Sequence, residues 1–393
     1  MKKSHVFGLV CAGGGAHGAY QVGVLKYIHH YFSDGKQSPF QIFSGTSCGS
    51  LNTSFYASHS HDAHAARLRL EELWLEFHIP KYHGNLIRNF IGSTVRDWLR
   101  PPEKRKPLWT LLDPKPMRDI VHKGFQRENL EKALRAGTTR GIAVSATELL
   151  SGRTCWFQEG LTAAPWNLFH SLGIIDQISP EHIEASCSVP VFLPPVKIGE
   201  RYYVDGSVSL HYPFSAAMTM GAGRILAIAT DKPIPAQLPH YVRSFRPKFS
   251  HIVRMMLNQL GHDHAPDEAA QIEVLNHFYE QLAKKHKQSK DDRPSRPLFH
   301  EEAHLAHYHP TDIFLFYPSR RIRQSDFEEL EDNSGAAKPR RTRFLFHKKF
   351  IRELIDLGYD DAQAKHQELK TFFTSAPKPE SRFHFFRRNR PQE

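Results

Sequence analysis

Residues 41–58 read QIFSGTSCGSLNTSFYAS. A short apolar strand is expected to end near Phe43 and a helix to continue from Leu51, and between them lies Gly45-Thr46-Ser47-Cys48-Gly49. This Gly-x-Ser-x-Gly spacing is that of a nucleophile elbow, a turn too sharp for side chains at the two glycine positions. The stretch therefore predicts a strand, a tight turn and a helix, with the Ser47 hydroxyl raised clear of the sheet and the helix N-terminus directed at the reacting atoms.

A glycine-rich turn precedes this unit. Residues 5–10 form a short apolar run, the loop Gly13-Gly14-Gly15-Ala16-His17-Gly18 follows, and apolar residues at helical spacing begin at Tyr20. The spacing Gly13-x-Gly15-x-x-Gly18 matches a dinucleotide-binding loop, but the acidic residue expected about 20 positions later is represented only by Asp34 in a polar turn.

The glycine loop has a second interpretation, as an oxyanion hole. Residues without side chains allow the backbone N–H groups of Gly13, Gly14 and Gly15 to converge on one developing negative oxygen, and each such donor contributes roughly 3 kcal/mol in comparable enzymes. A glycine loop after one strand and a serine turn after the next lie together in a parallel sheet. This juxtaposition favours acyl transfer over nucleotide binding.

A serine nucleophile needs a base. Asp205 is the most specific candidate, because it follows the strand-like run Tyr202-Tyr203-Val204 and precedes Gly206. A strand end commonly delivers a carboxylate to an active site, although the pattern alone favours an Asp-Gly hairpin turn. The alternative is a Ser-His-Asp triad, for which His211 stands out.

Further strands and helices alternate along the chain. Apolar strands are expected at residues 140–147 and 224–230, with a helix at 214–221 before the second. Strands that alternate with helices predict an α/β fold, a three-layer α/β/α arrangement with a mainly parallel central sheet and helices on both faces.

The strand–helix rhythm defines a catalytic domain over residues 1–230, with a helical insertion at about 73–110. Residues 231–300 are expected to form a helical insertion and a polar linker. One amphipathic helix there carries Phe249 and Ile252, and another carries Ile272 and Leu275.

The last part of the chain, residues 301–393, is predicted to be a C-terminal extension with one strand and one helix. The strand is expected at 312–317, and the helix at 350–357 is expected to end at Gly358. We expect the basic tail, residues 378–393, to be flexible.

The composition is that of a globular protein. The chain has 393 residues, of which 40% are hydrophobic and 24% charged, and no run approaches the 18 or so apolar residues of a spanning helix. The apolar run after the N-terminal lysines is too short for a cleavable export signal, so we expect a cytoplasmic protein.

The net charge of +11 is spread over the chain, because residues 1–230 carry +6 and residues 231–393 carry +5. Basic clusters occur at Arg100–Lys106, Lys338–Lys349 and Arg382–Arg390, and the last two contain aromatic residues. Such stretches suit an anionic membrane surface or a single-stranded nucleic acid. No nucleic-acid-binding fold signature accompanies them, so no nucleic-acid partner is expected.

The 26 histidines and four cysteines do not form a metal motif. The closely spaced sets His59, His61 and His64, and His304, His307 and His309, lack the His-Glu-x-x-His pattern of zinc hydrolases. We therefore expect no metal and no cofactor. The four cysteines are widely and irregularly spaced, which predicts buried reduced thiols.

The motifs taken together resemble the patatin-like phospholipase family. The resemblance rests on the glycine loop, on the serine turn extended through Ser50-Leu51-Asn52, and on Asp205-Gly206. It covers about residues 5–230 densely. Three further segments are similar to family blocks: Ala146-Thr147-Glu148 with Ser151-Gly152, Ala185-Ser186-Cys187-Ser188-Val189-Pro190, and Leu357-Gly358-Tyr359-Asp360-Asp361-Ala362.

The resemblance implies a Ser–Asp dyad without a catalytic histidine. Ser47 would be the nucleophile, Asp205 the base, and the amides of Gly13, Gly14 and Gly15 the oxyanion hole. The implied activity is hydrolysis of carboxylic esters of phospholipids or lysophospholipids. His17 stands where the family usually has Lys or Arg, and Ser207 replaces the commoner Gly or Ala.

A lipid substrate implies contact with a membrane surface. The segment Leu86–Trp109 mixes large apolar and basic residues, and we expect it to touch anionic lipid peripherally, with core packing of Trp98 and Trp109 as the alternative.

Overall fold

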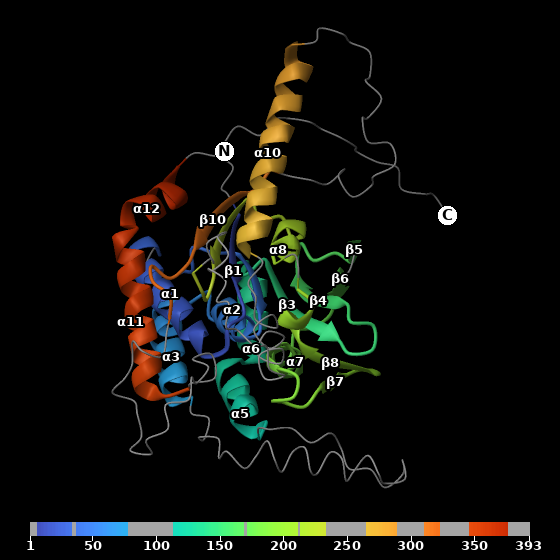
Figure 1. Cartoon of the computed structure of the whole chain (residues 1–393), viewed down its shortest axis with the longest axis vertical. Coiled ribbons are helices and arrows are strands. Elements are labelled where there is room, and N and C mark those ends of the chain that lie inside the picture. The colour runs from blue at the N-terminus through green and yellow to red at the C-terminus, as the bar shows by residue number, and fades with distance from the viewer. Residues whose placement is uncertain are drawn as a thin grey trace, which may run out of the picture.

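The computed structural model describes residues 6–33, 37–77, 113–168, 171–210, 213–232, 265–288, 310–322 and 346–375. Within these residues, ten strands form one mixed sheet (Figure 1). The strands are β1 (Phe7–Cys11), β2 (Ile42–Thr46), β3 (Gly141–Glu148), β4 (Thr154–Gly160), β5 (Trp166–Leu168), β6 (Ser171–Ile175), β7 (Val196–Ile198), β8 (Arg201–Asp205), β9 (Arg224–Ile228) and β10 (Asp312–Phe316).

Helices surround this sheet. They are α1 (Gly18–Phe32), α2 (Cys48–Ser58), α3 (Ala63–Glu76), α5 (Lys115–Gly124), α6 (Arg127–Ala136), α7 (Pro180–Cys187), α8 (Ser215–Thr219), α10 (Ala265–Gln288), α11 (Lys348–Ala364) and α12 (His366–Thr374). None of the described helices is long and apolar enough to cross a membrane.

One half of the sheet is entirely parallel. Its strands lie in the order β10-β9-β1-β2-β3, and each pairs in parallel with its neighbour. The sheet becomes mixed at β3, because two strands run antiparallel to it: β4 on the edge opposite β2, and β8 on the same edge as β2, beyond the end of that strand. β6 pairs in parallel with β4. The predicted α/β fold with a mainly parallel core is confirmed, and the strands predicted from the sequence lie where expected.

Alternation along the strands divides the core into two parts. Leu9 and Cys11 of β1 point to one cluster of buried side chains and Val10 points to the other. The same alternation separates Phe43 from Ile42 on β2. Because successive side chains of a strand face opposite sides of the sheet, a buried strand of this kind needs cover on both faces.

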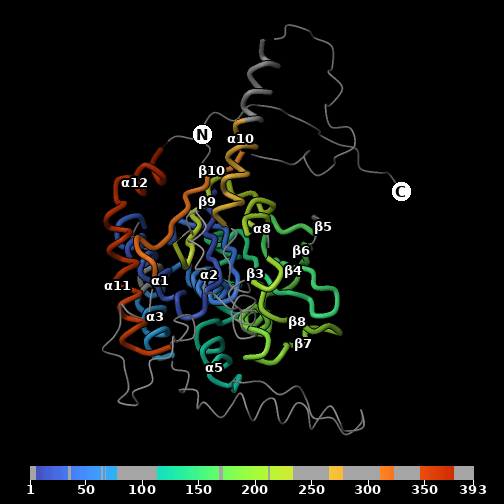
Figure 2. Tube along the Cα trace, in the orientation of Figure 1, coloured from blue at the N-terminus to red at the C-terminus, as the bar shows by residue number. Residues whose placement is uncertain are grey.

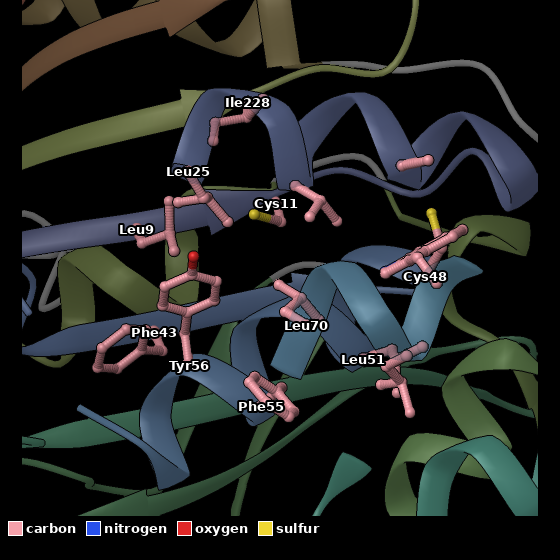
Figure 3. Close-up of a cluster of buried hydrophobic side chains, with 14 of the residues drawn as sticks. Leu9, Cys11, Leu25, Phe43, Cys48, Leu51, Phe55, Tyr56, Leu70 and Ile228 are labelled. Carbon is pink, nitrogen blue, oxygen red and sulfur yellow. The ribbon is translucent and has the colours of Figure 1, made fainter. Parts of the chain in front are cut away.

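The first face is covered by α1, α2, α3 and α11 (Figure 1). Figure 3 shows this core, in which Leu9 and Phe43 of the strands meet Leu25 of α1 and Tyr56 of α2. The second face is covered by α8 and the first turns of α10, through Phe214, Ala265 and Ile272. Alternate side chains of each parallel strand are buried on opposite faces of the sheet. A layer of helices on each face, with the sheet between them, therefore gives three layers.

Helix α11 does not end at Gly358, so that prediction is wrong. The helix continues to Ala364 and packs along α1, as Figure 2 shows for the red and blue segments. A Cβ atom on Gly358 would lie 2.1 Å from the carbonyl oxygen of Tyr20, and one on Gly23 would lie 1.9 Å from that of Ile355. The glycine therefore permits close contact between two helix backbones instead of ending one of them.

The C-terminal elements join the same sheet and the same helical layer as the N-terminal ones. β10 extends the sheet at β9, and buried Arg224 of β9 donates hydrogen bonds to the carbonyl oxygen of Phe372 and to Asp312.

The predicted division into domains stays a prediction, because residues 78–112, 233–264, 289–309 and 376–393 lie outside the described residues.

Candidate active site

The serine turn follows β2 directly. Ser47 has φ 53° and ψ −129°, a conformation that L-residues rarely adopt, and α2 begins at the next residue. A Cβ atom on Gly49 would lie 2.1 Å from the carbonyl oxygen of Cys11, and one on Gly45 would lie 2.3 Å from Thr53 Oγ1. The turn after β2 is thus pressed against β1 and its own helix, which leaves no room for side chains beside Ser47.

Asp205 ends β8, which is antiparallel to β3 and pairs Asp205 with Ala146. After Asp205 the chain enters a 3₁₀ turn, Gly206–Val208, so the Asp-Gly hairpin favoured by the pattern alone is wrong. A Cβ atom on Gly206 would lie 2.3 Å from Ser145 Oγ. The glycine is therefore required by close packing on β3, and the turn leaves the carboxylate at the end of the strand.

The structure brings Ser47 and Asp205 together. Ser47 Oγ donates a hydrogen bond of 2.7 Å to Asp205 Oδ2, and the Asp205 side chain is buried with 1% exposure. The other carboxylate oxygen, Oδ1, accepts from the Ser207 backbone N–H at 2.8 Å and from Ser207 Oγ at 2.6 Å. Ser47 can therefore pass its proton to a carboxylate whose position is fixed from the opposite side.

Burial raises the pKa of Asp205 to about 6, against the opposing effect of the hydrogen bonds from Ser207 and Ser47. Loss of water around a carboxylate disfavours its charged form, and hydrogen-bond donors favour it. The result is a carboxyl group that is ionised at neutral pH and basic enough to accept a proton during a reaction.

Two serines support the Ser47–Asp205 pair. Ser207 holds Asp205 Oδ1, and Ser186 Oγ accepts a 2.9 Å hydrogen bond from the Ser47 backbone N–H. In the sequence, Ser207 stands out only as a residue that replaces the commoner Gly or Ala of the family. A weak signal for its role exists, because an Asp side chain often accepts a hydrogen bond from the backbone N–H two residues later, an arrangement called an Asx turn. Ser186 lies in the segment 185–190 that is similar to a family block, but its contact with Ser47 depends on tertiary structure.

The glycine loop between β1 and α1 lies next to the serine. A Cβ atom on Gly13 would lie 3.1 Å from Ser47 Cβ, and one on Gly14 would lie 2.3 Å from Thr230 Oγ1. Gly15 has φ 59° and lines the same cavity as Ser47. In the described part of the chain, no group accepts a hydrogen bond from the backbone N–H of Gly13, Gly14 or Gly15.

His17 and Gly18 lie behind the loop. His17 is buried, with Nδ1 3.2 Å from Asp231 Oδ1 and its ring facing Phe350. Gly18 is packed so closely that an added Cβ would lie 2.8 Å from both Cys48 Sγ and the Trp74 ring. Neither residue lines the cavity at Ser47, so their contribution is to the packing behind the loop.

An apolar cavity opens beside Ser47. Its volume is about 40 Å³. Its lining is almost entirely hydrophobic or aromatic: Gly15, Ser47, Cys48, Leu51, Trp74, Phe77, Met117, Cys187, Val189, Phe192, Leu193 and Phe346. Such a lining favours contact with hydrocarbon over contact with polar groups beside the serine.

No histidine in the described residues forms a hydrogen bond with Ser47 or Asp205, and His211 lies outside them. Buried His59 stacks on Phe55 and takes no part in the site.

The described part of the chain also contains no group of three or more His, Cys, Asp or Glu residues that could hold a metal. All four cysteines are free and buried, as predicted.

Comparison with known proteins assigns most of this region to one family. The family model described as patatin-like phospholipase matches residues 9–218. Among solved structures, VipD from Legionella pneumophila aligns at 12% identity and a TM-score of 0.37 over 95% of this chain and 67% of that one. Human GIVD cytosolic phospholipase A2, in complex with methyl γ-linolenyl fluorophosphonate, aligns at 12% identity and a TM-score of 0.41 over 95% of this chain. The alignment spans 59% of the length of that human chain.

Proposed function

This chain belongs to the patatin-like phospholipase family, whose activity is lipid acyl hydrolysis, and on that premise we propose that it cleaves carboxylic esters of phospholipids or lysophospholipids through Ser47 and Asp205. The single observation that supports this proposal best is the 2.7 Å hydrogen bond from Ser47 Oγ to the buried carboxylate of Asp205. It joins a serine in a strained turn to a base beside an apolar cavity.

The first half-reaction transfers the acyl group to the enzyme. Asp205 Oδ2 takes the hydroxyl proton while Ser47 Oγ attacks the ester carbonyl carbon, and the carbonyl oxygen becomes an oxyanion. The N–H groups of Gly13, Gly14 and Gly15 stabilise that oxyanion. The bond from carbon to the leaving oxygen then breaks, the proton held on Asp205 moves to that oxygen, and the alcohol leaves. The acyl chain remains on Ser47 as an ester.

The second half-reaction returns the enzyme to its starting state. Asp205 removes a proton from water, whose oxygen attacks the acyl carbon and forms a second oxyanion at the same site. When the bond to Ser47 Oγ breaks, the serine recovers its proton and the fatty acid is released. One carboxylate acts in both halves, so the mechanism requires no histidine and no cofactor.

The cavity supports a fatty acyl substrate. Leu51, Trp74 and Phe77 present hydrocarbon and aromatic surface, and polar groups are almost absent from the lining apart from Ser47 and the backbone of Gly15. A bound acyl chain would bury apolar area at roughly 25 cal/mol per Å². The lining therefore favours an ester with an apolar acyl group over one with a small polar group.

Labelling with a fluorophosphonate serine probe tests this proposal. We expect the purified protein to react with the probe and to release fatty acid from phospholipid or lysophospholipid. Ser47→Ala should abolish both reactions, and Asp205→Asn should reduce turnover nearly as strongly. A matched control is Ser54→Ala, a buried serine of α2 outside the site. Retention of ester hydrolysis by Ser47→Ala, or tight dinucleotide binding without probe reaction, would overturn the proposal.

Access to lipid from a membrane surface is the second part of the proposal. The segment Leu86–Trp109 lies outside the described residues, so its proposed role rests on its mixture of apolar and basic residues. Co-sedimentation with vesicles should be stronger for anionic than for neutral lipid and should weaken as salt is raised. Equal binding to both kinds of vesicle, without a salt effect, would contradict the surface role.

A further inference from the structure

We propose that Thr230 is a positioning residue that orients the Gly13–Gly14 peptide so that the N–H of Gly14 serves the oxyanion site. This inference rests on the proposed function of Ser47 and of the glycine loop. Thr230 follows the end of β9 and has no side-chain exposure. Its hydroxyl donates a hydrogen bond of 2.6 Å to the carbonyl oxygen of Gly13.

The parallel pairing of β1 and β9 brings Thr230 to the loop. The ladder continues beyond both strands, because the Ala12 N–H donates to the carbonyl oxygen of Ile228 at 3.1 Å. Residues 13 and 14 therefore pass beside residue 230. An added Cβ on Gly14 would lie 2.3 Å from Thr230 Oγ1 and one on Gly13 would lie 3.1 Å from Ser47 Cβ, so successive loop residues face Thr230 and Ser47.

The hydrogen bond from Thr230 fixes a whole peptide plane. The C=O of Gly13 and the N–H of Gly14 belong to one trans peptide, in which the two groups point in opposite directions. With the carbonyl directed at Thr230, the N–H of Gly14 is directed away from Thr230. Acceptance of a hydrogen bond at the carbonyl also polarises the amide, which makes its N–H a better donor.

Thr230 acts on this peptide separately from the other supports of the loop. The preceding carbonyl, that of Ala12, is held by Gln21 Nε2 at 2.8 Å, and Gln21 in turn accepts from Asn52 Nδ2. That buried network fixes the Ala12–Gly13 peptide. Without the Thr230 hydroxyl, the Gly13–Gly14 peptide would lose the donor that sets its orientation, in a segment where glycines allow many backbone conformations.

Thr230→Val tests the inference, because valine keeps the shape of threonine and removes only the hydroxyl donor. Loss of one complete oxyanion donor costs about 10²–10³ in kcat, so disorientation of one should lower kcat by about 10-fold or more. We expect KM to change by less than about twofold, because ground-state binding of the acyl chain depends on the cavity. Thr230→Ser should restore most of the lost kcat.

A trifluoromethyl ketone with a long alkyl chain gives a second measurement, since it forms a tetrahedral oxyanion adduct with a serine. Its inhibition constant should rise in Thr230→Val by about the factor by which kcat/KM falls. The matched control is Thr139→Val, because buried Thr139 donates the same kind of hydrogen bond, to the carbonyl oxygen of Ala57 at 2.7 Å. This control should leave kcat and inhibition unchanged.

The outcomes separate this inference from the proposed function. If Ser47→Ala is inactive and Thr230→Val keeps wild-type kcat and wild-type inhibition by the ketone, the role of Thr230 is overturned and the proposed function stands. If Ser47→Ala remains active, both are overturned. Should Thr230→Val fail to fold, Thr230→Ser and Thr230→Ala carry the same test, because both lack the methyl group and only alanine lacks the hydroxyl.

Discussion

Ser47 and Asp205 are 158 positions apart in the chain, and their side chains meet in a hydrogen bond of 2.7 Å. Ser47 follows the last residue of β2, and Asp205 is the last residue of β8. Both strands pair with the same edge of β3, because β4 pairs with the other edge, and Asp205 lies opposite Ala146, one residue beyond the Thr46–Ser145 pair. The antiparallel direction of β8 places its last residue beside the ends of the parallel strands. A carboxylate that closes one strand thus faces a serine that follows another.

The pH dependence of catalysis should follow the ionisation of Asp205. Burial raises its pKa to about 6, and only the ionised form can accept the Ser47 proton. We expect kcat/KM to fall about tenfold per pH unit below about 6 and to be level above it. Rate profiles at two temperatures check the assignment, since the ionisation of a carboxyl group shifts little with temperature and that of an imidazole shifts strongly. A strongly temperature-dependent limb would indicate histidine as the base.

Asp205→Asn should stabilise the fold at high pH while it removes activity. The folded-state pKa of about 6 lies above the usual 3.8, so the contribution of Asp205 to stability is present in full below about pH 4 and is lost as pH rises through 6. A shift of about two units corresponds to about 3 kcal/mol at pH 8. Urea denaturation should therefore show a gain for Asp205→Asn at pH 8 and little change at pH 4. The exposed Asp360→Asn is the control, and an equal gain at both pH values would contradict the prediction.

Ser47→Gly should be more stable than Ser47→Ala by about 1 kcal/mol. Both variants lose the hydrogen bond to Asp205, but only glycine adopts φ 53° and ψ −129° without strain. Chemical denaturation of the two inactive variants gives the difference. In the middle of α2, where the backbone is regular, Ser54→Gly should instead be less stable than Ser54→Ala. The same order at both positions would show that Ser47 is not strained.

Val189→Trp should shorten the acyl chain that the enzyme accepts. Val189 lines the cavity beside Ser47, and an indole there would occupy space that the acyl group of the proposed substrate needs. We expect kcat/KM for long-chain nitrophenyl esters to fall about 10-fold or more relative to the butyrate ester. Leu161→Trp, at a position with 78% exposure, is the control. A uniform loss over all chain lengths would indicate damage to the fold.

Gly358→Ala should destabilise the protein, against the order of helix propensities. In an isolated helix the change would gain up to about 1 kcal/mol. Here the new methyl group would lie 2.1 Å from the Tyr20 carbonyl oxygen, so α11 must move away from α1. A net loss of about 2 kcal/mol is expected from overpacking, measured by thermal or urea unfolding. Asp360→Ala on the exposed side of α11 should change stability by less than about 0.5 kcal/mol, and a stabilised Gly358→Ala would contradict the close helix contact.

Local patterns predict much of this fold because they depend on neighbours in the chain. The period-two and continuous apolar runs locate β1, β2, β3, β9 and β10 to within a few residues, since a buried strand needs apolar side chains along its length. The same local rule fails at Gly358. A glycine that ends a helix and a glycine that admits a neighbouring backbone look alike in sequence, and only the position of α1 distinguishes them.

Turns and strands are specified largely by adjacent residues. The strand–turn–helix unit at Ser47, the glycine loop before it and the alternating α/β chain could therefore be predicted from the sequence. The family resemblance implies that Asp205 acts with Ser47, but the residues around Asp205 favoured a hairpin, and only the tertiary contacts exclude it. The same contacts show that Ser207 and Ser186 support the pair and that Thr230 holds the Gly13 carbonyl. These contacts join residues from separate strands. Their distances depend on the order and direction of strands in the sheet, which no local pattern contains.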